Sequence, residues 1–364
     1  MYFWIVNVEK SIDLAVDFLL SSIEPNTGGS SAFYSKILHP INGWHAPYPE
    51  TSGYLIPTLI NCANSSSKHV QLIPKAIKMA EWLLSIQQAD GAFSAGAWIQ
   101  KNDLTKSPFN TAQIIIGLIS AYQFTGISKY LDSASSASNW IVKIFESEIF
   151  PELSTRQHSF LPAYYSRIAW PLLQYTEINK DLSTASTAER LLQIILGLQT
   201  NNGEFADAGF SKNSPAYLHT ISYSLEGLLE SYLITNNESY LHAVLKGMKR
   251  IIYYQTNNNR LPGELTVDMK PRFHFRCLTG EAQIAFLCFQ LFNITNDRKY
   301  FEFGKKTLGE LVLLQPEKNG FRKRGGLSGS KPFYGPYARM RQPNWATKFL
   351  LDALLMFKSI QERS

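Results

Sequence analysis

The sequence predicts an all-α fold, an (α/α)6 toroid of six inner and six outer helices with long loops at one mouth. Two observations predict it. A helix-stop pattern recurs along the chain, and a helix rich in small and apolar residues follows each stop. Because one repeating unit spans residues 1–364, we expect a single toroid domain, although that length could form two or three ordinary domains.

The stops have a common form, in which a helical run leads to Gln, then to a polar Asn-Gly or Asp-Gly turn and an aromatic residue. Clear examples lie at 82–93, 191–205 and 308–321, with weaker versions at 15–29 and 248–261. Asn-Gly and Asp-Gly readily adopt the left-handed conformation that ends a helix. The regular spacing of these stops therefore indicates a repeat.

The helices that follow the stops are predicted to form the inner ring. Gly and Ala recur in them, which lets helix backbones approach closely around a central axis. They are expected at 50–60, 110–122, 164–175, 219–233, 278–292 and 344–357. Amphipathic outer helices are expected at 70–88, 129–146, 185–200, 238–255 and 298–315. Short polar links join inner to outer helices, so the long loops gather at the opposite end, where we expect binding and chemistry.

Composition indicates a globular protein, since 45% of the residues are hydrophobic and 18% are charged. The three cysteines are odd in number and lack CxxC spacing, which predicts neither a disulfide framework nor a thiolate zinc site. A reducing compartment, the cytoplasm, fits this usage. The apolar N-terminal run is too short for an export signal or a membrane span. No metal or nucleotide motif is present, and we expect no cofactor.

Positive charge is concentrated near the C-terminus. The net charge is +6, and the segment from Lys318 to Lys348 holds Lys and Arg but no Asp or Glu. Since guanidinium groups match carboxylates, this last loop predicts a basic wall for carboxylated or sulfated sugars. A solvated surface is the simpler alternative. Nucleic acid is less favoured, because the basic residues occupy one loop and not a groove-sized helix face.

The loops at the predicted mouth combine aromatic side chains that have polar tips with charged side chains, as a sugar-binding cleft requires. Asp103 and His158 are expected among them. The predicted substrate-binding residues are Trp44, His45, Tyr48, Trp98, Asn110, Tyr165, Arg167, His274, Arg276, Tyr334, Arg339, Arg341, Asn344 and Trp345.

Proton abstraction beside a uronate carboxylate needs a base of the His, Tyr or Lys type and a group that neutralises the carboxylate. His219, Tyr217 and Tyr337 are the candidates for proton transfer, on adjacent parts of the ring. His219 could instead be a helix-start residue satisfied by the backbone, and the two tyrosines could pack or stack on a ligand.

Hydrolysis instead needs two carboxyl groups, of which one is kept protonated by its surroundings. The candidates are Glu50, Asp207, Glu264 and Glu281. Glu50 and Glu281 fall in first helical turns, where a carboxylate can also serve to stabilise the helix dipole. The sequence leaves both roles open.

The Gln-x-x-Asp/Asn-Gly-x-Phe turns resemble those of α/α toroids found in glycan-active hydrolases, lyases and epimerases, and also in terpene cyclases and prenyltransferases. The stretches 277–286 and 344–354 resemble parts of bacterial polysaccharide-cluster proteins and of the helical domain of glucuronyl C5-epimerases. Asp-rich DxDD and DDxxD motifs are missing, which disfavours isoprenoid chemistry.

The resemblance implies an enzyme that acts on a uronate-containing glycan by proton abstraction, as a lyase or an epimerase. Three alternatives stay open: a glycoside hydrolase with a carboxylate pair, a non-catalytic glycan-binding toroid, and a terpene cyclase-like or prenyltransferase-like protein. The fold does not choose among them, because it hosts unrelated chemistries.

Overall fold

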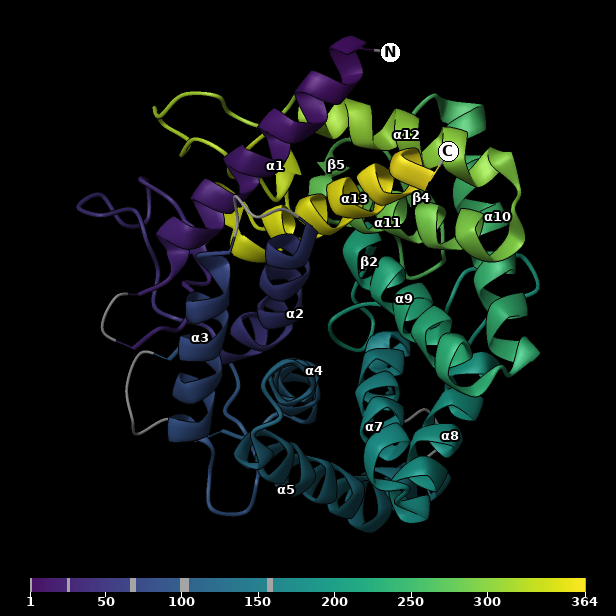
Figure 1. The fold of residues 1–364 in the computed structure, drawn as a ribbon. Helices are drawn as coiled ribbons and strands as arrows, with labels where there is room; N and C mark the ends of the chain where they lie inside the picture. The colour runs from purple at the N-terminus through teal and green to yellow at the C-terminus, as the bar shows by residue number, and fades with distance from the viewer. Residues whose placement is uncertain (1, 25–26, 66–69, 99–104, 156–159, 364) are drawn as a thin grey trace.

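The computed structural model describes residues 2–24, 27–65, 70–98, 105–155 and 160–363 and confirms the (α/α)6 toroid (Figure 1). The inner helices of the described residues are α2 (Pro49–Ser65), α4 (Pro108–Thr125), α7 (Ser166–Asn179), α9 (Leu218–Thr235), α11 (Leu278–Thr295) and α13 (Asn344–Arg363). The outer helices are α1 (Tyr2–Ser22), α3 (Leu72–Ile86), α5 (Ser128–Ile144), α8 (Leu182–Gly197), α10 (Glu238–Asn258) and α12 (Arg298–Val312).

The ring closes where the two ends of the chain meet. Each inner helix packs against the next, and α13 packs against both α2 and the outer helix α1 (Figure 1). Two irregular segments lie between α5 and α7. A π-helical turn (Phe145–Ile149) and α6 (Phe150–Thr155) extend α5, and a 3-10 turn (Ala163–Tyr165) precedes α7. The inner helix expected at 164–175 therefore begins two residues later than predicted.

In two of the stops, the turn glycine allows the turn to contact the next outer helix, whereas Gly320 of the third stop makes no such contact and Gly325 approaches α1 instead. Gly91 and Gly203 have φ of 95° and 103°, in the left-handed region. A Cβ atom at Gly91 would lie 2.2 Å from the carbonyl oxygen of Ser136, and one at Gly203 would lie 2.5 Å from that of Lys246. Conformation and close approach thus both require glycine at these positions.

The Gln that recurs in the stops also has a structural role. In each of three repeats the Gln amide donates to one glycine carbonyl in the loop that follows it and to one carbonyl in the next outer helix. The acceptors are Gly91 and Ser133 for Gln87, Gly203 and Ala243 for Gln199, and Gly325 and Ser11 for Gln315. The Gln side chain therefore ties neighbouring repeats together.

The inner helices crowd as predicted. A Cβ atom at Gly53 would lie 2.6 Å from the Cα atom of Ile114, and one at Gly280 would lie 2.6 Å from the backbone nitrogen of His219. At the end with short links, inner helices stop at left-handed residues such as Asn236 and Asn296, and Asn237 and Asp297 cap the outer helices that follow.

Short antiparallel strands fasten the long loops at the other end of the ring, which we call the long-loop end. They form three small sheets among the described residues: β1 (Phe33–Tyr34) with β7 (Gln342–Pro343); β2 (Ala216–Tyr217) with β3 (Glu264–Leu265), which also pairs with β4 (Pro271–Arg272); and β5 (Arg276–Cys277) with β6 (Ser330–Lys331). These pairings hold the segments before α2, α9, α11 and α13 in place.

The cysteines Cys62, Cys277 and Cys288 are free and buried. Among the described helices, none combines the length and the apolar character needed to cross a membrane.

Candidate active site at the long-loop end

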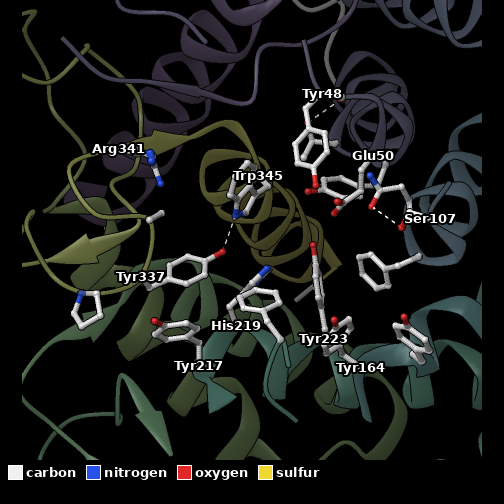
Figure 2. Close-up of a pocket in the computed structure, with 18 residues that line it drawn as sticks. Tyr48, Glu50, Ser107, Tyr164, Tyr217, His219, Tyr223, Tyr337, Arg341 and Trp345 are labelled. Atoms are coloured by element: carbon white, nitrogen blue, oxygen red, sulfur yellow. Dashed lines mark hydrogen bonds between the residues drawn. The ribbon is translucent and has the colours of Figure 1, made fainter. Parts of the chain in front are cut away.

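A cavity of about 430 Å³ opens at the long-loop end, against the N-terminal turns of the inner helices (Figure 2). Its walls are mainly aromatic, with a few polar and charged groups. The residues predicted from the sequence that line it are His219, Tyr217, Tyr337, Glu50, Tyr48, Asn110, Tyr165, Arg341 and Trp345.

Several lining residues were not predicted, among them Tyr54, Phe109, Phe210 and Tyr223. Two of them could have been found from helical spacing. Tyr54 follows Glu50 by four residues, and Tyr223 follows His219 by four, so each pair lies on one helix face. Phe210 lies in a loop, where no periodicity indicates the direction of a side chain.

Glu50 is the one carboxyl group among the described residues that line this cavity. It lies in the first turn of α2 and is 8% exposed. Burial raises the pKa of Glu50 to about 7, against the opposing effects of a hydrogen bond from Tyr48 and of the Arg167 charge. A carboxyl group with this pKa can both hold and release a proton at neutral pH.

His219 is the second residue of α9 and is 4% exposed. Its Nδ1 lies 2.7 Å from Oε1 of Gln283. Burial lowers the pKa of His219 to about 3, and the nearby Arg167 charge adds to the effect, while the Gln283 hydrogen bond opposes it. The imidazole is therefore neutral at physiological pH.

Arg341 lies across the view from Glu50 in Figure 2, with Trp345 between them. Its guanidinium carbon is 4.8 Å from the ring centroid of Phe33. The buried Nε of Arg341 has no hydrogen-bond partner among the described residues. An unpartnered buried N–H is costly, so an acceptor supplied by a ligand would stabilise this side chain.

The aromatic walls are held in fixed orientations by contacts with one another. Nε1 of Trp345 donates to the Tyr337 hydroxyl at 2.8 Å, as Figure 2 shows, and the Tyr217 and Tyr337 rings lie 5.2 Å apart. Across the cavity, Phe109 stacks on Tyr165 at 6.2 Å. Such surfaces suit the apolar faces of sugar rings, and the hydroxyl groups remain available for directional bonds.

Arg167 lies behind the cavity wall and does not line the cavity. It has 0% exposure, and its Nη1 forms an ion pair of 2.6 Å with Glu226. The Arg167 guanidinium carbon also lies 4.3 Å from the centroid of the Tyr223 ring. The predicted substrate-binding residue is thus a core residue that supports the wall, because a carboxylate one helix away neutralises it.

The other candidate carboxyl groups lie outside the cavity lining. Arg276 binds Glu281 through two nitrogens and also pairs with Glu310 at 3.0 Å. Arg272 pairs with Glu264 at 3.3 Å. Asp207 lines a separate small cavity of about 110 Å³. The described residues therefore bring no second carboxyl group to Glu50.

Most of the remaining predicted residues serve the packing of the loops. Trp44 packs on Phe18 and Tyr34, His45 stacks on Phe33 and contacts His39, His274 packs on Phe275, and Asn344 donates to Ser30 and Thr51. Tyr334 and Arg339 are exposed, and Trp98 lines a different cavity with Gln87 and Lys106. Asp103 and His158 lie outside the described residues.

The basic segment is less continuous than the sequence predicted. The prediction was wrong for Lys348, which is 7% exposed and pairs with Asp352 at 2.6 Å. The reason is that α13 begins at Asn344, so Lys348 points into the ring. Arg324 pairs with Asp17 at 2.6 Å, whereas Arg341 reaches the cavity.

Solved structures resemble the whole chain. An unsaturated glucuronyl hydrolase specific for heparin has a TM-score of 0.73 and 15% identity, with 98% of each chain covered. Cellobiose 2-epimerase from Bacillus thermoamylovorans B4167 has a TM-score of 0.72 and 11% identity, with 97% of this chain and 99% of that chain covered. The chain has the fold of glycan-active toroid enzymes.

An unsaturated glucuronyl hydrolase from Streptococcus agalactiae is also similar, with a TM-score of 0.69, 13% identity, and 96% of this chain and 91% of that chain covered. No protein-family model and no curated protein sequence matches the chain. Identities this low establish the toroid fold alone, and the reaction must be argued from the cavity.

Proposed function

We propose that this protein is a carbohydrate-active enzyme that binds the uronate end of a small anionic oligosaccharide and transfers a proton between Glu50 and a carbon of the sugar. One observation carries the proposal. A buried carboxyl group with a pKa of about 7 shares an aromatic cavity with an Arg341 side chain whose buried Nε has no partner among the described residues.

The proton transfer follows from the chemistry of a uronate. The carbon that bears the carboxylate loses its proton when the resulting negative charge can spread into the carboxylate and is neutralised there. Arg341 would bind the carboxylate, and Glu50 would take the proton. Delivery of a proton to the opposite face of the carbon by a second donor, such as a tyrosine of the cavity wall, gives an epimer. Departure of the neighbouring substituent with its bonding electrons, and its protonation, gives an unsaturated product.

The size and the walls of the cavity support a short ligand. A cavity of about 430 Å³ is at the small end of the range for ligand sites, which suits one or two sugar rings. Trp345 and Tyr337 provide a rigid surface for a ring, and Asn110 and Tyr48 provide polar groups beside Glu50. A chain end fits this shape better than the middle of a polymer.

The single carboxyl group favours a second candidate, hydrolysis of an unsaturated uronyl sugar. Ordinary glycoside hydrolysis uses two carboxyl groups, whereas the double bond of an unsaturated uronide is an enol ether that needs one proton donor before water adds. Protonated Glu50 could be that donor. The similarity to unsaturated glucuronyl hydrolases supports this alternative.

The test is incubation with saturated and unsaturated uronate disaccharides and with neutral disaccharides in deuterated water, followed by NMR. An epimerase incorporates deuterium without cleavage, a lyase forms a product that absorbs in the near ultraviolet, and a hydrolase consumes the unsaturated sugar and releases a new reducing end. The Glu50→Gln variant should do none of these. Turnover that is unchanged in this variant, or confined to neutral sugars, would contradict the proposal.

A further inference from the structure

Behind the cavity wall, a chain of buried polar side chains runs from Arg167 to His219. Nη1 of Arg167 lies 2.6 Å from Oε1 of Glu226, and Nε2 of Gln283 donates to Oε2 of Glu226 at 3.2 Å. Oε1 of Gln283 then lies 2.7 Å from Nδ1 of His219. These residues come from α7, α9 and α11, and each of them is at most 4% exposed.

The direction of every hydrogen bond in this chain follows from its first member. Arg167 is a permanent cation that forms an ion pair with Glu226, and a carboxylate can only accept. Gln283 must therefore present its NH2 group to Glu226, and its carbonyl oxygen faces His219. Because that oxygen also can only accept, Nδ1 of His219 carries the proton and donates it.

This tautomer determines the state of the other imidazole nitrogen, Nε2. A neutral histidine with its proton on Nδ1 has a lone pair on Nε2. Since Nδ1 is occupied by Gln283, which is not among the residues that line the cavity, Nε2 is the nitrogen available to a ligand. Figure 2 shows the imidazole between Tyr217 and Tyr223, facing the same space as Glu50.

We infer that Gln283, Glu226 and Arg167 lock His219 in the tautomer with the proton on Nδ1, so that Nε2 accepts a hydrogen bond from a hydroxyl group of the bound sugar. His219 then selects and orients the substrate, and Gln283 is a positioning residue. This inference rests on the proposed function for the identity of the ligand, but the tautomer does not depend on it.

The low pKa of His219 agrees with this role, because burial beside the Arg167 charge keeps the imidazole neutral and unable to donate from Nε2. Glu50 and His219 therefore differ in whether they exchange protons. Glu50 exchanges protons near neutral pH, and His219 is an acceptor throughout. A sugar hydroxyl is a donor that fits Nε2, whereas a second acceptor, such as an ether oxygen, would be rejected.

The test is ¹⁵N NMR of the intact protein labelled in its histidines, with the His219→Asn variant used to assign the resonances. Free neutral histidine prefers the proton on Nε2, so the structure predicts the less common form. We expect a pyrrole-type Nδ1 and a pyridine-type Nε2 for His219, both unchanged from pH 7 to pH 5. A protonated Nε2, or an imidazolium form in that range, would overturn the inference.

Two variants on the same helix sharpen this test. Gln283→Leu should remove the hydrogen bond that fixes the tautomer, so that the form of His219 protonated on Nε2 appears. This variant should also weaken binding of a uronate disaccharide about tenfold more than it weakens binding of an analogue that lacks the recognised hydroxyl. Gln290→Leu is the matched control, because Gln290 donates to half-buried Glu230 at 2.6 Å in the same way but is not bonded to His219. It should leave the tautomer unchanged.

The outcomes separate the two proposals. If His219 shows the expected tautomer but no uronate binds, the proposed function fails and the lock stands. If uronates bind and turn over while His219 carries its proton on Nε2 in the wild-type protein, the lock fails and the proposed function stands. Since the decisive spectrum is that of the wild-type protein, instability of Gln283→Leu or Gln290→Leu would not obscure the result.

Discussion

The two ends of the ring hold cavities of similar size and different chemistry. The cavity at the long-loop end has a volume of about 430 Å³, and a second cavity of about 470 Å³ is lined by the middle and C-terminal parts of the inner helices. The second cavity is lined by Glu226, Glu230, Lys348 and Asp352, among others. By the number of charged side chains alone, it would be the stronger candidate for a site.

The charges of the second cavity, however, are largely paired with one another. Glu226 pairs with Arg167 and Asp352 with Lys348, each at 2.6 Å, and Asp352 also accepts from Thr58 at 2.7 Å. At the long-loop end, Glu50 has no ion-pair partner among the described residues, and Nε of Arg341 has no acceptor. The number of charged side chains therefore does not by itself distinguish a candidate site from a polar part of the core; at the long-loop end, an arginine without an ion-pair partner among the described residues lines the same cavity as the raised-pKa carboxyl group.

The largest expected effect comes from two glutamates with raised pKa values, one in each cavity. Burial raises the pKa of both Glu50 and Glu230 to about 7, so Gln is a close replacement for the protonated form of each. Glu50→Gln should lower kcat about 1000-fold on the active uronate, because the acid–base group is lost. Glu230→Gln should change it less than threefold. Equal losses in steady-state kinetics would break the comparison.

The next largest effect is on stability and concerns the ion pair between Lys348 and Asp352 in the second cavity. Lys348→Met should lower the free energy of unfolding by about 3 kcal/mol, since it leaves Asp352 buried without a counter-ion. Lys358→Met, on the same helix, removes a more exposed pair with Glu9 and should cost less than 1 kcal/mol. Urea denaturation measures both. Similar values for the two variants would show that Lys348 is not a structural charge.

The pH dependence of stability gives a third effect of similar or smaller size. Between pH 4.5 and pH 7 the folded protein holds a proton on Glu50 that the unfolded chain releases, so the free energy of unfolding falls as pH rises through this window. Glu50→Gln should remove up to about 3 kcal/mol of that fall. Urea denaturation of both proteins at matched pH values checks it, and parallel curves would contradict the raised pKa.

The smallest effect concerns ligand binding. Arg341→Gln should weaken uronate binding about tenfold and reduce its dependence on salt, because one charged contact is lost. Arg339→Gln, two residues away and exposed, should have little effect beyond a small change in salt dependence. Calorimetric titration at two salt concentrations distinguishes them. If Arg339→Gln weakened binding more, the carboxylate would lie on the outer loop surface and not in the cavity.

Features that depend on local sequence could be predicted well. The Gln87, Gln199 and Gln315 turns indicated the repeat, and the structure gives the reason, since each Gln joins its turn to the next outer helix. The small residues Gly53 and Gly280 correctly indicated crowded inner helices. These signals are local because each repeat makes the same contacts with its neighbour.

The roles of charged side chains could not be predicted in the same way. Arg167 and Arg341 are equally plausible ligand-binding residues in the sequence. In the structure, Arg167 of α7 forms an ion pair with Glu226 of α9, whereas Arg341 pairs with no carboxylate among the described residues. Glu50 and Glu281 both occupy first helical turns, yet of the two only Glu281 forms an ion pair with an arginine among the described residues. Such differences depend on partners far away in the chain, which periodicity does not reveal.

The most direct test of the central claim is a crystal structure of the Glu50→Gln variant soaked with a uronate disaccharide. We expect the sugar in the long-loop cavity, with its carboxylate at hydrogen-bonding distance, about 3 Å, from the guanidinium group of Arg341 and one ring against Trp345. We also expect no sugar in the second cavity. Density for the disaccharide between Glu230 and Lys348, with the long-loop cavity empty, would contradict the account.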